Sequence, residues 1–68
     1  MISKERVKEL EEKGFQRWQK GSFIRLYMKY NGYEIEDYKG IGFTVFYQGD
    51  EIFFRTEDEA REFIDQEG

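Results

Sequence analysis

Apolar and polar residues alternate along the middle of the chain, whereas apolar residues recur at helical spacing near both ends. A period of two is typical of a half-buried strand, and apolar residues three or four positions apart indicate one face of a helix. Runs of strands flanked by helices predict the α+β class. We therefore expect one small α+β domain over residues 1–68, with an antiparallel meander of three or four strands between an N-terminal and a C-terminal helix.

The first helix is predicted between Ser3 and Gly14. Ser3 is a favourable N-cap residue because its hydroxyl can accept a hydrogen bond from the first turn. Gly14 suits the left-handed position after the last turn, and Phe15 can then fold back onto Leu10. Val7 and Leu10 give this helix only a narrow apolar stripe.

The strongest hairpin signal is the pair Asn31 and Gly32, which lies between the alternating segments 23–30 and 33–38. A two-residue loop there places Tyr30 opposite Tyr33. The segment before residue 23 is predicted only as an extended lead-in that ends in a turn. Six residues are expected on the inward face of the hairpin: Ile24, Leu26, Met28, Tyr30, Tyr33 and Ile35. Seven are expected on its outward face: Phe23, Arg25, Tyr27, Lys29, Glu34, Glu36 and Tyr38.

Two registers are open for the next strand, residues 41–47. A slip of one residue would exchange its two sets of side chains between the faces of the sheet. A two-residue turn would place Phe43 opposite Glu36. We prefer an odd-length connection with a bulge at Gly40 or Gly42, because it turns Phe43 and Val45 inward.

A second hairpin is predicted at Gly49 and Asp50, which fit a type II′ loop. This loop would place Phe46 opposite Phe53. Both rings are then expected on the outer face of the sheet.

The C-terminal helix is predicted to begin after Thr56, because Thr56 and Glu59 have the spacing of a capping box. The helix is expected to end near Gly68. Three apolar residues share one side of it: Ala60, Phe63 and Ile64.

The outer face of the predicted sheet combines aromatic rings with cations and is the first candidate binding surface. We consider three roles: a helix covers it as a second half-core, a protein or second copy binds it, or its rings stack on single-stranded nucleic acid. Glu34 and Glu36 would repel phosphates, which disfavours nucleic acid. The candidate partner-binding residues on this face are Arg25, Tyr27, Tyr38, Phe46 and Phe53.

Trp18 has two interpretations. The favoured one is a lid over the edge of the core, beside Val7 and Leu10. The other is a partly exposed interface hot spot beside Arg17, and Trp18 is therefore also a candidate partner-binding residue.

The C-terminal helix is acidic and is the second candidate surface. Asp58, Glu62 and Asp65 are expected on one side of it. Carboxylates spaced along a surface can imitate a phosphate backbone and occupy a basic cleft. The favoured interpretation is instead a solvated helix face whose acids favour the positive end of the helix dipole.

The charge distribution favours a protein partner over nucleic acid. The net charge is −4, but residues 1–30 carry +4 and residues 31–68 carry −8. Affinity for nucleic-acid backbones comes mostly from cations, so an acidic half argues against broad binding of this kind.

The chain has no cysteine and no histidine, which removes the usual thiolate and imidazole metal ligands and the commonest general base. No phosphate-binding glycine motif is present, and the two serines, Ser3 and Ser22, have structural roles as cap and turn residues. We therefore expect no enzyme activity, no cofactor and no metal.

The composition also suggests a location. No signal peptide or membrane-spanning run is recognisable, so a soluble, cytoplasmic protein is expected. The function expected is a non-enzymatic protein-interaction module, with a small acidic inhibitor of the phage-encoded kind, docking on a basic nucleic-acid-handling protein, as its narrower form. The alternatives are a single-stranded nucleic-acid binder and a structural homodimer.

Overall fold

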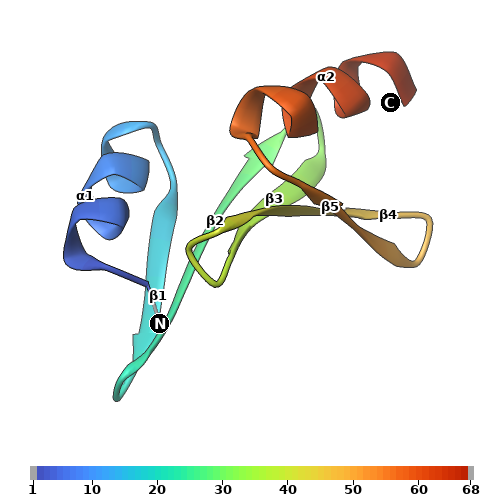
Figure 1. The fold of residues 1–68 in the computed structure, drawn as a ribbon. Helices are drawn as coiled ribbons and strands as arrows, with labels where there is room; N and C mark the ends of the chain where they lie inside the picture. Colours follow the sequence, from blue (N-terminus) through green and yellow to red (C-terminus); the bar gives the residue numbers. More distant parts are fainter. Residues whose placement is uncertain (1, 68) are drawn as a thin grey trace.

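The computed structural model describes residues 2–67, which form two helices and one five-stranded sheet (Figure 1). The α+β class with a helix at each end is confirmed. The predicted helix end near Gly68 lies outside the described residues. The elements are α1 (Lys4–Glu12), β1 (Gln16–Lys20), β2 (Phe23–Tyr30), β3 (Tyr33–Tyr38), β4 (Gly42–Tyr47), β5 (Asp50–Phe54) and α2 (Glu57–Glu67).

Each strand of the sheet pairs antiparallel with the next one in the sequence. The segment predicted only as a lead-in is the full strand β1, which pairs with β2 from Gln16 opposite Tyr27 to Lys20 opposite Phe23. Gly21 opens the two-residue turn between them with a φ of +61°. The meander therefore has five strands, with β1 and β5 at its edges.

The β2–β3 hairpin has the predicted register, with Tyr30 opposite Tyr33. Asn31 and Gly32 have φ values of +50° and +85°, the left-handed values that a type I′ turn requires. The prediction is confirmed because the turn chemistry and the apolar pattern specify the same pairing.

The β3–β4 connection has an odd length and turns Phe43 and Val45 inward, as predicted. Lys39 and Gly40 have φ values of +52° and +74°. The extra residue is Ile41 rather than either flanking glycine, because Ile41 has no partner in the ladder and its side chain is 67% exposed. One unpaired residue at the turn thus keeps the alternation of β4 in phase with that of β3.

The predicted β4–β5 register is wrong by two residues. Gln48 and Gly49 form the turn, with φ values of +50° and +85°, one residue earlier than expected. Phe53 therefore lies opposite Thr44 rather than Phe46. A shift of two residues keeps every side chain on its predicted face, because the side-chain period of a strand is two.

Helix α1 begins and ends as predicted. The side chain of Ser3 accepts a backbone hydrogen bond from the first turn at 3.1 Å. At the other end, Phe15 and Gly14 donate their N–H groups to the carbonyls of Leu10 and Glu11 at 3.0 and 3.1 Å, as in a Schellman motif. This ending carries Phe15 into the core.

Both helices pack on the same face of the sheet, α1 over β1 and β2 and α2 over β4 and β5 (Figure 1). Helix α2 begins with the predicted cap, in which Glu59 donates its N–H to the Thr56 hydroxyl at 3.2 Å. Ile24 and Met28 pack partly buried against the core, as expected for inward residues. The buried core residues are Val7, Leu10, Phe15, Leu26, Ile35, Phe43, Val45, Ala60 and Ile64.

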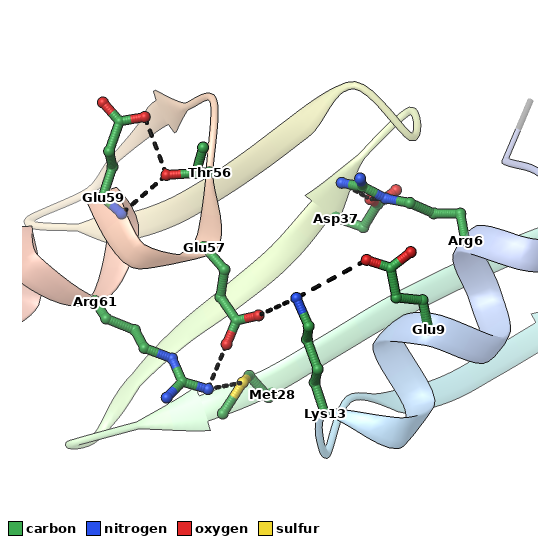
Figure 2. Close-up of polar contacts among 9 residues, drawn as sticks. All are labelled: Arg6, Glu9, Lys13, Met28, Asp37, Thr56, Glu57, Glu59 and Arg61. Carbon is green, nitrogen blue, oxygen red and sulfur yellow. Dashed lines mark hydrogen bonds and ion pairs between the residues drawn. The ribbon is translucent and has the colours of Figure 1, made fainter.

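Ion pairs join the helices to each other and to the sheet (Figure 2). Lys13 at the end of α1 lies 3.8 Å from Glu57 at the start of α2, and Glu57 also pairs with Arg61. Arg6 of α1 pairs at 2.9 Å with Asp37 of β3, whose side chain is 4% exposed. The Lys13 side chain is 51% exposed, and pairs open to solvent contribute only about 0–1 kcal/mol. The shared apolar core is the main reason that both helices lie on this face.

The C-terminal end of α2 is attached to the β2–β3 turn through Asp65. Its carboxylate accepts hydrogen bonds from the Tyr30 hydroxyl at 2.9 and 3.1 Å and from Asn31 Nδ2 at 3.2 Å. The hydrogen bond to Asp65 raises the pKa of Tyr30 above its ordinary value, because it stabilises the protonated phenol. The ring of Tyr30 packs against the core, as expected for an inward residue, and its hydroxyl reaches Asp65.

We expect Tyr30 to make the protein less stable in alkaline solution. Its folded-state pKa is raised, so its contribution is complete below the unfolded-state pKa, near about 10, and is lost as the pH rises through the folded-state value. Urea unfolding between about pH 8 and about pH 11.5 should show a steeper loss of stability in the wild type than in Tyr30→Phe. Tyr33→Phe is the matched control and should follow the wild type. Equal pH dependence in Tyr30→Phe and the wild type would contradict the role of this hydrogen bond.

Candidate functional site: the outer face of the sheet

The face of the sheet that points away from α1 and α2 is uncovered, and it is called the outer face below. Strand alternation sends one set of side chains to the helices and the other set to solvent. The interpretation that a helix covers these rings as a second half-core is therefore contradicted, because both helices belong to the single core on the inner face. Five large rings on the outer face are exposed: Phe23 (60%), Phe46 (55%), Phe53 (46%), Trp18 (45%) and Tyr38 (38%).

Trp18 belongs to the outer face and does not cover the core. The β1–β2 register places it opposite Arg25, on the side away from α1. Its ring meets the ring of Phe23 at a centroid distance of 6.0 Å and an interplanar angle of 75°. The favoured interpretation of Trp18 as a lid beside Val7 and Leu10 is therefore wrong, because those residues lie on the opposite side of the sheet.

A second ring pair is formed by Tyr38 and Phe53, at 5.7 Å and 78°. Gly42 lies opposite Tyr38 and leaves the space that the Phe53 ring fills. A Cβ atom on Gly42 would overlap that ring and would lie 2.7 Å from the carbonyl oxygen of Phe54. From the sequence, Gly42 was a candidate for a bulge. Its role is to leave room for the Phe53 ring against β4.

We expect Gly42→Ala to destabilise the protein by about 1–3 kcal/mol, because the added methyl group overpacks the site below Phe53. The φ of Gly42 is not left-handed, so the cost arises from crowding rather than from backbone strain. Urea unfolding gives the free energy of unfolding. Thr44→Ala, on the same face of β4, is the control and should cost less than about 1 kcal/mol. A Gly42→Ala variant as stable as the wild type would show that the ring of Phe53 is not seated there.

Arg25 lies between the two ring pairs and is held by carboxylates of β3. Its Nη2 and Nε atoms donate to Glu36 at 2.7 and 3.1 Å, and Glu34 lies 3.8 Å away. The guanidinium also lies 5.5 Å from the centroid of the Tyr27 ring. The hydrogen bond to Glu36 raises the pKa of Arg25 above its ordinary value. Arg25, the central cation of the outer face, stays charged, and its charge is already balanced by the carboxylates of Glu34 and Glu36.

Phe46 stands apart from the two ring pairs. It borders a depression of about 150 Å³ that is also lined by the carboxylates of Glu34, Glu36 and Glu51. Three acids and one arginine, Arg25, surround this depression, so the surface next to Phe46 is negative. Such a surface repels a phosphate backbone.

The acidic candidate residues lie away from the rings. Asp58 and Glu62 are exposed on α2, which packs on the inner face, so they and the rings face opposite sides of the sheet. Asp65 is engaged with Tyr30 and Asn31. Sequence reasoning brought the rings of one face together correctly, but it did not place the acidic helix relative to them.

Residues 2–67 contain no group of three or more acidic side chains placed to hold a metal ion. Neither helix in this part of the chain is long and apolar enough to cross a membrane.

Comparison with known proteins gives no match for this chain. No protein-family model, no curated protein and no solved structure matches it significantly. A function for the chain therefore has to follow from its own residues.

Proposed function

We propose that this chain is a non-enzymatic protein-interaction module that binds its partner with the outer face. The observation that supports this proposal is the set of five exposed rings on a sheet face that neither helix covers. Large apolar residues exposed together on one face of a small domain tend to mark an interface. Aromatic residues and arginine are also the residues most often responsible for interface affinity.

The outer face is preorganised for binding. Trp18 and Phe23 support each other edge to face, as do Tyr38 and Phe53 above Gly42. Side chains held in place by strands and by neighbouring rings lose little conformational entropy on binding. A partner would therefore gain contact area at a low ordering cost.

A single-stranded nucleic acid fits this face less well than a protein. The rings could stack on bases, but Arg25 is already paired with Glu36, and the surroundings of Phe46 are acidic. A strand bound near Arg25 and Phe46 would bring its phosphates close to the carboxylates of Glu34, Glu36 and Glu51. A protein surface does not carry this penalty.

The acidic helix supports the narrower proposal of an inhibitor that docks on a basic partner. Residues 50–67 carry eight acids and two arginines. Three of the six acids of α2 have partners within the fold, namely Glu57, Glu59 and Asp65. Helix α2 also faces away from the rings. We therefore assign it long-range attraction of a basic partner, which affects the association rate, and we assign the contact itself to the outer face.

The two surfaces can be separated by site-specific crosslinking in a host lysate. A benzophenone side chain replaces Phe46 in one version of the protein and Glu62 in another. We expect the Phe46 position to form a discrete protein adduct and the Glu62 position to form little of it. An adduct that disappears on nuclease treatment would identify nucleic acid instead, and an adduct of twice the chain mass would identify a second copy.

Two polar variants test which surface provides the affinity. Phe23→Thr with Phe46→Thr should abolish the adduct, measured with benzophenone at Tyr38, while the free energy of unfolding changes by no more than about 1 kcal/mol. Asp58→Lys with Glu62→Lys should slow adduct formation without abolishing it. Loss of the adduct only in the lysine variant would move the binding surface to α2 and contradict the proposal.

A further inference from the structure

Strand β1 is an edge strand of the sheet, and within residues 2–67 no strand pairs with its free edge. All five of its residues are exposed, and α1 lies beside it at this end of the molecule (Figure 1). An unpaired edge presents a row of N–H and C=O groups that another extended chain can bind. β1 is thus a second surface, next to the outer face but different in chemistry.

The backbone of β1 offers two residues to a new strand. The two-residue turn after Lys20 is closed by a hydrogen-bonded pair, Lys20 and Phe23, and such pairs alternate with non-hydrogen-bonded pairs along an antiparallel ladder. Arg17 and Gln19 therefore direct their N–H and C=O groups away from β2. Within residues 2–67, no backbone hydrogen bond from outside the sheet reaches either residue.

A groove of about 400 Å³ lies between α1 and the inner side of β1 and β2. Lys4 and Lys8 of α1 and Arg17 of β1 line it, against a single acid, Glu11, which lies 3.8 Å from Arg17. The net charge of these lining residues is therefore positive, in a protein whose total charge is −4. Its apolar lining consists of Ile2, Val7 and Ile24.

We propose that the edge of β1 binds an extended acidic peptide segment of a partner protein as a sixth strand. The backbone groups of Arg17 and Gln19 pair with the peptide, and its alternate side chains point into the groove. Glutamate suits these positions, because its methylene groups cover the apolar lining and its carboxylate reaches Lys4 or Lys8. The remaining side chains of the peptide lie on the side of Trp18.

The charges select this occupant over a second copy of β1. Two β1 strands side by side would each bring a net charge of +2, and like charges on an edge oppose self-pairing. The competing occupant is the acidic strand β5 of a second copy, which would extend the sheet head to tail without closing it. That arrangement would appear as self-association that increases with protein concentration.

The probe is a capped peptide of sequence Thr-Glu-Val-Glu-Val-Glu-Thr. Trp18 is the only tryptophan of the chain, so its fluorescence reports the β1 edge directly. We expect a saturable change in emission that weakens as salt screens the groove. NMR should also show slower solvent exchange of the Arg17 and Gln19 amides. The same peptide with lysine in place of glutamate should bind at least about tenfold more weakly, because it meets cations of its own sign.

Variants of β1 and α1 test the two parts of the site. Gln19→Pro removes the outward N–H and blocks the edge, yet leaves the bonds to β2, and should weaken binding at least about tenfold. Gln19→Thr retains the N–H and should bind as the wild type does. Lys4→Glu with Lys8→Glu reverses exposed charges on α1 and should also weaken binding at least about tenfold. Phe46→Thr should leave peptide binding unchanged, which separates this site from the outer-face proposal.

Several results would overturn the proposal. These are equal binding of the lysine and glutamate peptides, equal binding by Gln19→Pro and Gln19→Thr, or unchanged exchange of the Arg17 and Gln19 amides. Should Gln19→Pro fail to fold, the lysine reversals and the amide exchange of the wild type decide. Self-association that Gln19→Pro abolishes and that the peptide does not reduce would assign the edge to a second copy and would equally overturn it.

Discussion

The pleat of the five strands is the constraint on which this structure depends. Successive side chains of a strand point to opposite faces, and both helices of this chain cover the same one. Leu26, Ile35 and Val45 from the central strands lie at 0–1% exposure under the helices. The single extra residue at the β3–β4 turn, Ile41, keeps this division consistent across the sheet. Five of the outward rings are exposed as a consequence of the same division, and Tyr27, beside Arg25, is half-buried.

The faces could be predicted from the sequence better than the pairings. Asn31 and Gly32 specify one turn, so the β2–β3 register was predictable. The glycine at 49 fits two competing two-residue turns, and turn chemistry alone does not choose between them. The resulting error of two residues cannot move a side chain to the other face. Trp18 was misplaced because the exposed segment QRWQK lacks the apolar–polar alternation that is typical of a half-buried strand. The pairing of this segment with β2 could therefore not be predicted from the sequence.

The face that the helices cover could not be predicted from apolar content, because both faces carry large apolar residues. The two faces differ in the charged residues that lie among the apolar ones. The inner face of the central strands is apolar except for Asp37, whereas the outer face interleaves its rings with Arg25, Glu34 and Glu36. Burying these charges under a helix would cost several kcal/mol of desolvation. The basic N-terminal part and the acidic C-terminal part of the chain also form ion pairs with each other, between Arg6 and Asp37 and between Lys13 and Glu57. An external basic partner is therefore not needed to account for all of it.

Exposed rings on a sheet have a structural explanation as well as a functional one, and the two apply to different residues. Cross-strand aromatic contacts stabilise a sheet by about 0.2–1 kcal/mol each, which is a sufficient reason for the pair of Trp18 and Phe23. The pair of Tyr38 and Phe53 depends on a glycine within a strand, which costs about 0.5–1 kcal/mol relative to alanine, so its net contribution to stability is small. Phe46 makes no ring contact within residues 2–67 and yet is 55% exposed. Packing within the fold therefore does not explain an aromatic ring at this position. Phe46 is the outer-face residue for which a binding role is the better explanation.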